Sequence, residues 1–225
     1  LLDRGFQVYL DAYPNAGQLL DLAALDLQSF EPGAIIFEKG KKYRLMDVFR
    51  RPRSLFSSAL SPIGNLMDKI LVAKLRFSLK FSSIDKIQKR EDLATEVYLK
   101  KFGFSDGMID RFFRSFYGGI FLENELRTSS RMFEFTFKMF TEGSASLPAR
   151  GMEEIPRQLS GRLAAGVLHC NTQVSEVIGN EVILASGVRL TFDHLVLAVP
   201  SDAAQKLLPA LALPEVKWRS VTNCY

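Results

Sequence analysis

Few residues of this sequence have the types and spacing that would carry chemistry by themselves. Its two histidines, His169 and His194, each stand at the edge of an apolar run, where a structural histidine is expected. No G-x-S-x-G turn is present to expose a nucleophilic serine. The two cysteines, Cys170 and Cys224, form no C-x-x-C pair, so no metal site is predicted, and Cys170 is expected to be a buried thiol. No catalytic residue is assigned, because a cofactor-borne reaction and a non-catalytic domain would both look like this.

The elements that could position a cofactor lie in residues 147–200. A turn at Pro148 and Gly151 predicts a helix that ends at Gly166, with an apolar residue every four positions: Ile155, Leu159 and Leu163. Four strand-like runs follow: V-L-H-C, Q-V-S-E-V-I, E-V-I-L-A-S and R-L-T-F. The next run, H-L-V-L-A-V-P, is nearly all apolar, which predicts a strand covered on both faces. This order predicts an insertion into a doubly wound α/β sheet, a fold that binds ligands beyond its strand ends.

The middle of the chain has a different periodicity. Residues 34–38 and 43–45 predict a strand pair of the kind found in an antiparallel sheet. Further helices are expected from Arg90 to Gly103, from Ser105 to Gly118, and from Leu126 to Phe140. Residues 63–81 predict an amphipathic helix, with Asp68 and Lys69 on its solvent face and an inward apolar face made by Leu66, Ile70, Ala73 and Phe77.

Phenylalanine is concentrated in this helical part. The chain has 18 phenylalanines, and more than half lie between Phe77 and Phe140. Such a block is usually core, because each ring buries roughly 150–250 Å². It could also form the wall of a substrate pocket, and the best candidates surround a Gly-Gly break: Phe112, Phe116, Tyr117 and Phe121.

Composition and charge set further bounds. The 225 residues are 47% hydrophobic and 24% charged, which is typical of a globular protein. Between Lys39 and Arg90 there are fourteen Lys and Arg residues against three Asp residues, although the net charge of the whole chain is only +4. Such a segment is either the solvated face of helices or a patch for a membrane surface or another polyanion. No nucleic-acid partner is expected.

Four pieces in a fixed order resemble a known family. They are G-M-x-x-I-P-x-x-L, N-T-x-V-x-x-V, L-x-S-G-x-x-L and D-H-L-V-L-A-V-P, and they are similar to the middle of the flavin-containing amine oxidoreductase superfamily. That group includes amine oxidases, protoporphyrinogen oxidases and phytoene-desaturase-like enzymes. The opening L-L-D-R-G-F-Q-V-Y-L-D-A-Y-P and the closing W-R-S-V-T-N-C-Y resemble further segments of it.

The resemblance implies an α/β fold class. An incomplete FAD/NAD(P)-binding doubly wound fold would carry a mixed helical and antiparallel-sheet substrate domain. The implied division is 1–42 for part of the FAD-binding domain and the start of the substrate-domain sheet, and 43–146 for the helical substrate domain. Residues 147–205 would be an FAD-binding segment with a β-meander, and 206–225 a return to the substrate-domain sheet. The family's G-x-G-x-x-G loop does not occur in these residues, so we expect an internal fragment that is inactive on its own and binds FAD weakly.

The same resemblance carries over to particular residues. The phrase at Gly5, Phe6 and Gln7 lies beside the isoalloxazine ring in related enzymes, although Phe6 stands where many relatives have a second glycine. The backbone of Val174 would hold the adenine edge of FAD. The segment Ala198, Val199 and Pro200 would be the strand end at the cofactor, where small side chains let the backbone come close.

The resemblance implies an FAD-dependent oxidoreductase that removes a hydride from a small apolar or amphipathic substrate. The alternatives are a carotenoid-type desaturase or isomerase working at a membrane surface, and a non-catalytic scaffold that has kept the fold.

Overall fold

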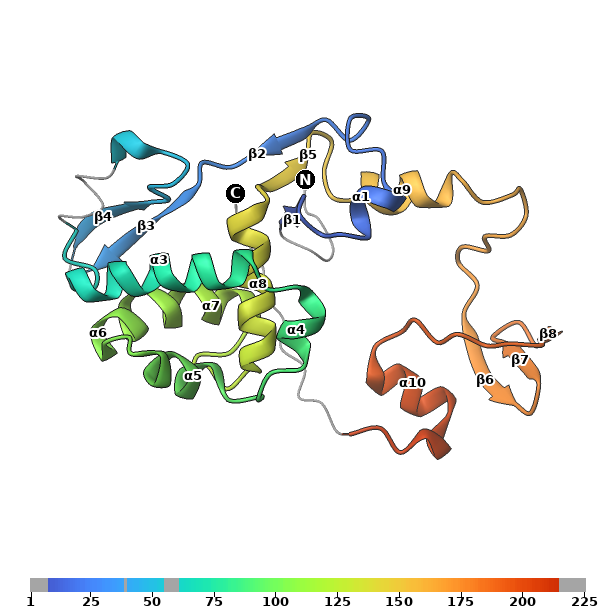
Figure 1. Ribbon diagram of the computed structural model, residues 1–225. Helices are drawn as coiled ribbons and strands as arrows, with labels where there is room; N and C mark the ends of the chain where they lie inside the picture. Colours follow the sequence, from blue (N-terminus) through green and yellow to red (C-terminus); the bar gives the residue numbers. More distant parts are fainter. Residues whose placement is uncertain (1–7, 39, 55–60, 215–225) are drawn as a thin grey trace. The chain divides into compact units, whose positions relative to one another are not determined.

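The structure is a computed structural model that describes residues 8–38, 40–54 and 61–214 (Figure 1). These residues form two compact units, which meet in the chain between Gly161 and Arg162. Gly5, Phe6 and Gln7 lie outside the described residues. The division into cofactor-domain and substrate-domain parts stays a prediction.

A small sheet joins the two sides of the helical middle in the first unit. Its central strand is β5 (Ala145–Pro148), which pairs antiparallel with β1 (Tyr9–Leu10) on one side and with β2 (Leu27–Ser29) on the other. Since β1 and β2 precede the helical middle and β5 follows it, the chain leaves this sheet and returns to it.

Two short helices lie beside this sheet, α1 (Ala16–Leu19) and α9 (Glu154–Ser160). The N–H of Asp21 donates to Oε1 of Gln158 at 2.8 Å, and the Gln158 amide donates back to the Asp21 carbonyl at 3.0 Å. The helix predicted to run to Gly166 stops at Ser160. Leu163 is exposed, so no apolar burial would support further turns.

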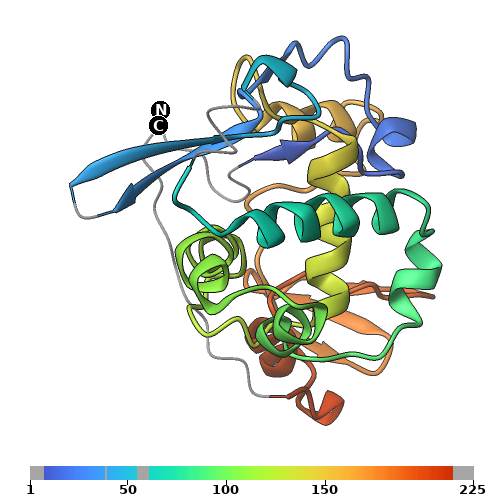
Figure 2. The same ribbon diagram turned by 60° about the vertical axis from the view of Figure 1, so that its left-hand side comes forward.

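The predicted strand pair is confirmed and is longer than expected. Strands β3 (Gly33–Glu38) and β4 (Lys41–Met46) pair antiparallel, with Ile36 opposite Tyr43. These two side chains pack against the helical core, whereas Ile35 and Phe37 point to solvent. Figure 2 shows the pair as a ribbon extending from the rest of the first unit.

The helical middle forms the main apolar core. Its largest fully buried side chains include Tyr117, Phe113 and Phe133. Ser105, where a helix was expected to begin, is an N-cap, since its hydroxyl accepts from the Met108 N–H at 3.2 Å. The elements are η1 (Pro52–Ser54), α3 (Leu66–Lys80), α4 (Ile84–Gln88), α5 (Thr95–Phe102), α6 (Asp106–Met108), the π-helical η2 (Ile109–Phe113), α7 (Arg114–Phe121) and α8 (Ser130–Glu142).

The helix predicted over 63–81 is present as α3, but its buried face is the opposite of the one expected. Leu66, Ile70 and Phe77 are exposed, whereas Leu75 and Leu79 are buried. Asp68, expected in solvent, is 1% exposed. Its carboxylate accepts from the N–H of Asn65 at 2.8 Å, forming a capping box, and from both the N–H and the hydroxyl of Ser105. These hydrogen bonds satisfy the buried charge.

Helix α8 crosses α3 (Figure 2) and begins later than predicted. Leu126 is buried but has φ +52°, so it lies in the preceding loop. Phe133 and Phe137 are buried, whereas Met132 is exposed.

The second unit contains a three-stranded antiparallel meander. Its strands are β6 (Val174–Ile178), β7 (Glu181–Leu184) and β8 (Arg189–Thr191), in the order β6-β7-β8. Turns at Gly179 and Gly187, both with positive φ, connect them. Helix α10 (Ser201–Leu207), followed by η3 (Pro209–Leu211), packs against β6. This meander confirms three of the four strand-like runs.

Two predictions in this unit are wrong. The V-L-H-C run forms no strand: Val167 and Leu168 are exposed, Asn171 turns the chain with φ +55°, and Cys170 is exposed rather than buried. The H-L-V-L-A-V-P run is extended but not a strand, and Val196 is 86% exposed. A strand covered on both faces needs neighbouring strands, and no described residue pairs with this run. Helices with small antiparallel sheets thus define the α/β class observed here.

Candidate functional site

The predicted adenine contact lies on an open strand edge. Val174 begins β6, which is half-buried there and pairs with β7 on one side, opposite Leu184. The other side of β6 has no partner strand among the described residues. A strand edge offers backbone N–H and C=O groups in a row, so the free edge of β6 has donors and acceptors for a further strand or a ligand.

The predicted strand end lies in the same unit, directly before α10. Ala198, Val199 and Pro200 are all exposed, and Pro200 is the N-cap residue of α10. Because α10 packs against β6, the structure brings the end of this segment to the element that carries Val174. Ala198 leaves its backbone accessible to a ligand.

The four predicted pocket-wall residues lie in the aromatic core of the first unit. Tyr117 is buried and the other three are half-buried. Phe112 stacks on Phe116 at 5.7 Å between ring centroids, and Tyr117 contacts Phe121 at 5.4 Å. Burial raises the pKa of Tyr117 well above its ordinary value. Their role in a substrate pocket stays a prediction.

One buried polar group was not singled out by the sequence. Tyr9 is 5% exposed, and its hydroxyl has no hydrogen-bond partner in the part of the chain that the structure describes. Burial raises the pKa of this hydroxyl, and the charges of Asp11 and Tyr13 add to the effect. Because buried polar atoms are nearly always paired, an unpaired donor is a group available to a ligand. Tyr9 lies two residues after Gln7. In the sequence, nothing distinguishes a tyrosine at this position from an ordinary core aromatic.

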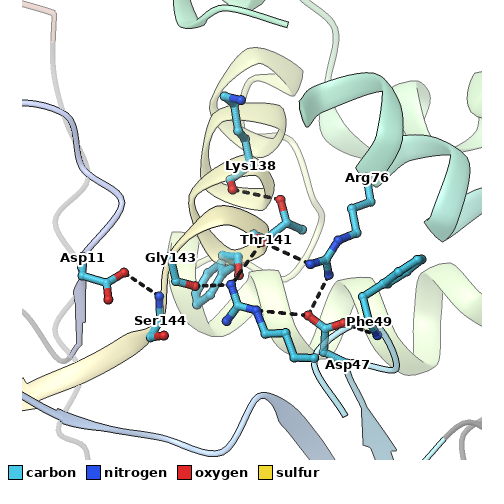
Figure 3. Close-up of polar contacts among 10 residues, drawn as sticks. Asp11, Asp47, Phe49, Arg76, Lys138, Thr141, Gly143 and Ser144 are labelled. Atoms are coloured by element: carbon cyan, nitrogen blue, oxygen red, sulfur yellow. Dashed lines mark hydrogen bonds and ion pairs between the residues drawn. The ribbon is translucent and has the colours of Figure 1, made fainter. Parts of the chain in front are cut away.

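A polar network holds the sheet to the helices of the first unit (Figure 3). The Arg50 guanidinium donates to the carbonyl of Thr141, in the last turn of α8, at 3.1 Å and to that of Gly143, the C-cap residue, at 2.5 Å. Asp47 pairs with both Arg50, at 3.6 Å, and Arg76, at 2.6 Å. The carboxylate of Asp11, next to β1, accepts from the Ser144 N–H at 2.5 Å. Cations at a helix C-terminus are stabilising, so this network fixes where β5 begins.

A second charged cluster is also structural. Glu134 on α8 is buried, pairs with Arg90, and accepts from the Tyr98 hydroxyl at 2.7 Å. Burial and this hydrogen bond raise the pKa of Tyr98 far above its ordinary value. A shallow pocket of about 250 Å³ lies beside it, lined by Arg90, Glu91, Leu93, Tyr98, Lys101 and Phe102. Lys101 pairs with Glu91 at 2.9 Å, so the charges of the pocket are already matched.

Comparison with known proteins identifies the family. Residues 1–225 match the model of the flavin-containing amine oxidoreductases, so the chain belongs to this family. A search of curated proteins gave no match. Among the described residues, no group of three or more His, Cys, Asp or Glu side chains could hold a metal ion.

Within the second unit, the described residues fit a flavin cofactor in kind: the free edge of β6 supplies backbone groups, and Ala198 supplies a small side chain next to an accessible backbone. In the first unit, taken by itself, Tyr9 supplies an unpaired donor. None of these is a nucleophile or a general base, so they can bind and orient a group but not carry a redox step themselves.

Proposed function

We propose that this protein is an FAD-dependent oxidoreductase that removes a hydride from a small apolar or amphipathic substrate, in the manner of an amine oxidase. The observation that carries the proposal is the family match over residues 1–225. FAD would supply the hydride acceptor, and the described residues would supply binding, orientation and exclusion of water.

In this proposal the second unit contributes backbone contacts. The N–H and C=O groups of Val174, on the free edge of β6, would bind the adenine edge. The exposed backbone at Ala198 would approach the cofactor, and the 194–200 segment would add a strand to a doubly wound sheet. Its apolar residues support this, because exposed apolar runs usually mark a surface that becomes covered.

The first unit would contribute the substrate side. The aromatic cluster at Phe112, Phe116, Tyr117 and Phe121 would form an apolar wall. Gly5, Phe6 and Gln7 would lie beside the isoalloxazine ring, and the Tyr9 hydroxyl, two residues further on, would donate to a polar atom of the ligand.

A second candidate is a carotenoid-type desaturase or isomerase. The observation that favours it is the exposed apolar face of α3, since an enzyme of hydrophobic substrates held in lipid would work at a membrane surface. Substrate turnover separates the two candidates, and both require bound flavin.

Flavin content of the purified full-length protein tests the proposal. We expect oxidised-flavin absorption bands that remain after desalting and a flavin released on denaturation. Ala198→Leu should lower flavin content several-fold, because the larger side chain keeps the cofactor from the backbone. Ala164→Leu is the matched control: it is equally exposed in the same unit and should keep its flavin.

Both substitutions are at exposed positions, so neither should change folding by more than about 0.5 kcal/mol. A colourless wild-type protein that binds no added FAD would favour a non-catalytic scaffold instead. Equal flavin in both variants would show that Ala198 is not at the cofactor.

A further inference from the structure

Helix α3 presents an apolar stripe to solvent. It consists of Leu66, Ile70, Phe77 and Phe81, which we call the α3 stripe. Leu66 is 71% exposed, Phe77 67% and Phe81, the C-cap residue, 66%. At about 100° per residue, Leu66, Ile70 and Phe77 fall within roughly 40° of one another around the helix axis. Aligned, exposed side chains of this size mark an interaction surface.

The orientation of α3 is fixed by its other face. Leu75 and Leu79 are fully buried, and the carboxylate of Asp68 is held by Asn65 and Ser105. At the far end, Lys138 donates from Nζ to the Leu79 carbonyl at 3.0 Å. Rolling the helix to hide the α3 stripe would expose this core and break the hydrogen bonds from Ser105 to Asp68, so the stripe faces outward in the folded first unit.

The charged residues of α3 that flank the α3 stripe are lysines. On a helical projection Lys74 lies along one side of it, and Lys69 and Lys80 lie along the other. The ammonium of Lys74 stands 5.5 Å from the ring centroid of Phe102, and that of Lys80 stands 5.9 Å from the ring centroid of Phe81. Lys69 donates to the Ser61 carbonyl at 2.9 Å. The only acidic residue of α3 is Asp68, which is buried and so contributes no negative charge to this face.

An apolar stripe bordered by lysines has the composition of a helix that lies in a membrane interface. The apolar side chains enter the acyl boundary while the lysine stems extend their ammonium groups to the headgroups. A purely apolar partner would gain nothing from lysines on both sides, whereas an anionic surface is complementary to them. No helix among the described residues is long and apolar enough to cross a membrane.

We propose that the α3 stripe docks this protein onto an anionic lipid surface, with Lys74 and Lys80 contacting the headgroups. The docking uses α3 alone and needs neither flavin nor substrate. It is therefore separate from the proposed oxidoreductase function, and either can fail without the other.

Vesicle co-sedimentation of the full-length protein tests this. We expect binding to vesicles of phosphatidylcholine mixed with phosphatidylglycerol, little binding to phosphatidylcholine alone, and weaker binding as salt is raised. Ile70→Ser/Phe77→Ser should weaken the binding more than about tenfold, because both side chains would otherwise be buried in the interface. Lys74→Gln should weaken it about fivefold.

The control is Val97→Ser/Met132→Ser, which removes equally exposed apolar side chains from α5 and α8 of the same unit. This variant should bind as the wild type does, and all variants should keep the wild-type thermal midpoint and flavin content. Absence of vesicle binding by the wild type, or equal binding by the stripe variant and the control, would overturn the proposal. So would loss of a dimer in the stripe variant with unchanged vesicle binding, because the stripe would then be a contact between two copies.

Discussion

At the scale of single residues, two tyrosines differ in whether their hydroxyl is paired: Tyr98, which is half-buried, and Tyr9, which is buried. Tyr98 donates to buried Glu134 at 2.7 Å, whereas Tyr9 has no partner among the described residues. Tyr98→Phe should lower the free energy of unfolding by about 1–3 kcal/mol, since Glu134 loses a bond to its buried charge. Tyr9→Phe should leave the flavin-free protein unchanged or slightly more stable. Urea unfolding of both variants measures the difference.

The same pair also tests whether Tyr9 serves a ligand. If its hydroxyl donates to flavin or substrate, Tyr9→Phe should shift the flavin absorption bands or lower flavin content while stability is kept. Tyr98→Phe should lower stability but keep the wild-type flavin content and absorption bands. A Tyr9→Phe protein that is destabilised as much as Tyr98→Phe would mean that the hydroxyl has a structural partner.

Residue-level expectations were only partly predictable from the sequence. Ser105 as an N-cap follows from a hydroxyl just before a helical period, and the structure confirms it. The burial of Asp68 was missed, although the N-x-x-D spacing from Asn65 is a capping-box signal. The exposure of Cys170 could not be anticipated, because it depends on whether the run before it finds a partner strand.

At the scale of elements, α3 shows what hydrophobic periodicity can and cannot predict. Its sequence has apolar residues on two sides, Leu66, Ile70 and Phe77 on one and Leu75 and Leu79 on the other. Hydrophobic spacing predicts the helix but does not choose between these sides. The choice is made by long-range contacts, chiefly the hydrogen bonds from Ser105 to Asp68. The hairpin β3–β4 was easier to predict from the sequence, because its alternating pattern and its turn are local signals that span only a few residues.

The loop between α7 and α8 depends on one carboxylate. Glu123 accepts from the N–H and hydroxyl of Thr128, both at 3.1 Å, and from the N–H of Glu125 at 2.8 Å. Burial alone would raise the pKa of Glu123, but these hydrogen bonds outweigh it and hold the pKa below its ordinary value of 4.5. Ionised Glu123 therefore stabilises the fold above pH 4.5, and this contribution is lost as the pH falls through the lowered pKa.

We expect Glu123→Gln to lower stability at pH 7 by about 0.5–1.5 kcal/mol, because an amide cannot accept from donors on both of its atoms. The difference from wild type should shrink as the pH is lowered below 4.5. Glu125→Gln is the control, since Glu125 makes only an exposed ion pair with Arg127. Thermal melts across this pH range measure both. A Glu123→Gln deficit that is the same at every pH would contradict the assignment.

At the scale of the whole molecule, the sequence indicated where the helical middle lies better than it predicted buried strands, and the division into cofactor-domain and substrate-domain parts stays a prediction. The change of character after β4 and before β5 marks the helical middle, and the sheet β1-β5-β2 closes around it. The 194–200 run was predicted as covered because its composition is apolar. An apolar composition indicates that a segment is stable when covered, but it does not show which strands cover it. The described residues contain no strand that pairs with this run.

The two units differ sharply in how much apolar surface they bury. In the described part of the second unit, Ala204 is the one apolar residue that is buried, whereas the first unit encloses two apolar clusters. Regions with few buried apolar contacts open at lower free energy.

In flavin-free full-length protein we therefore expect backbone amides of β6, β7 and β8 to exchange with solvent deuterium at least tenfold faster than those of α8 around Phe133 and Phe137. Adding FAD should slow exchange in β6 and at 195–199, because the proposed contacts cover these groups, and should leave α8 unchanged. Equal protection of β6 and α8 before FAD is added would mean that the second unit is stabilised by contacts other than those within it.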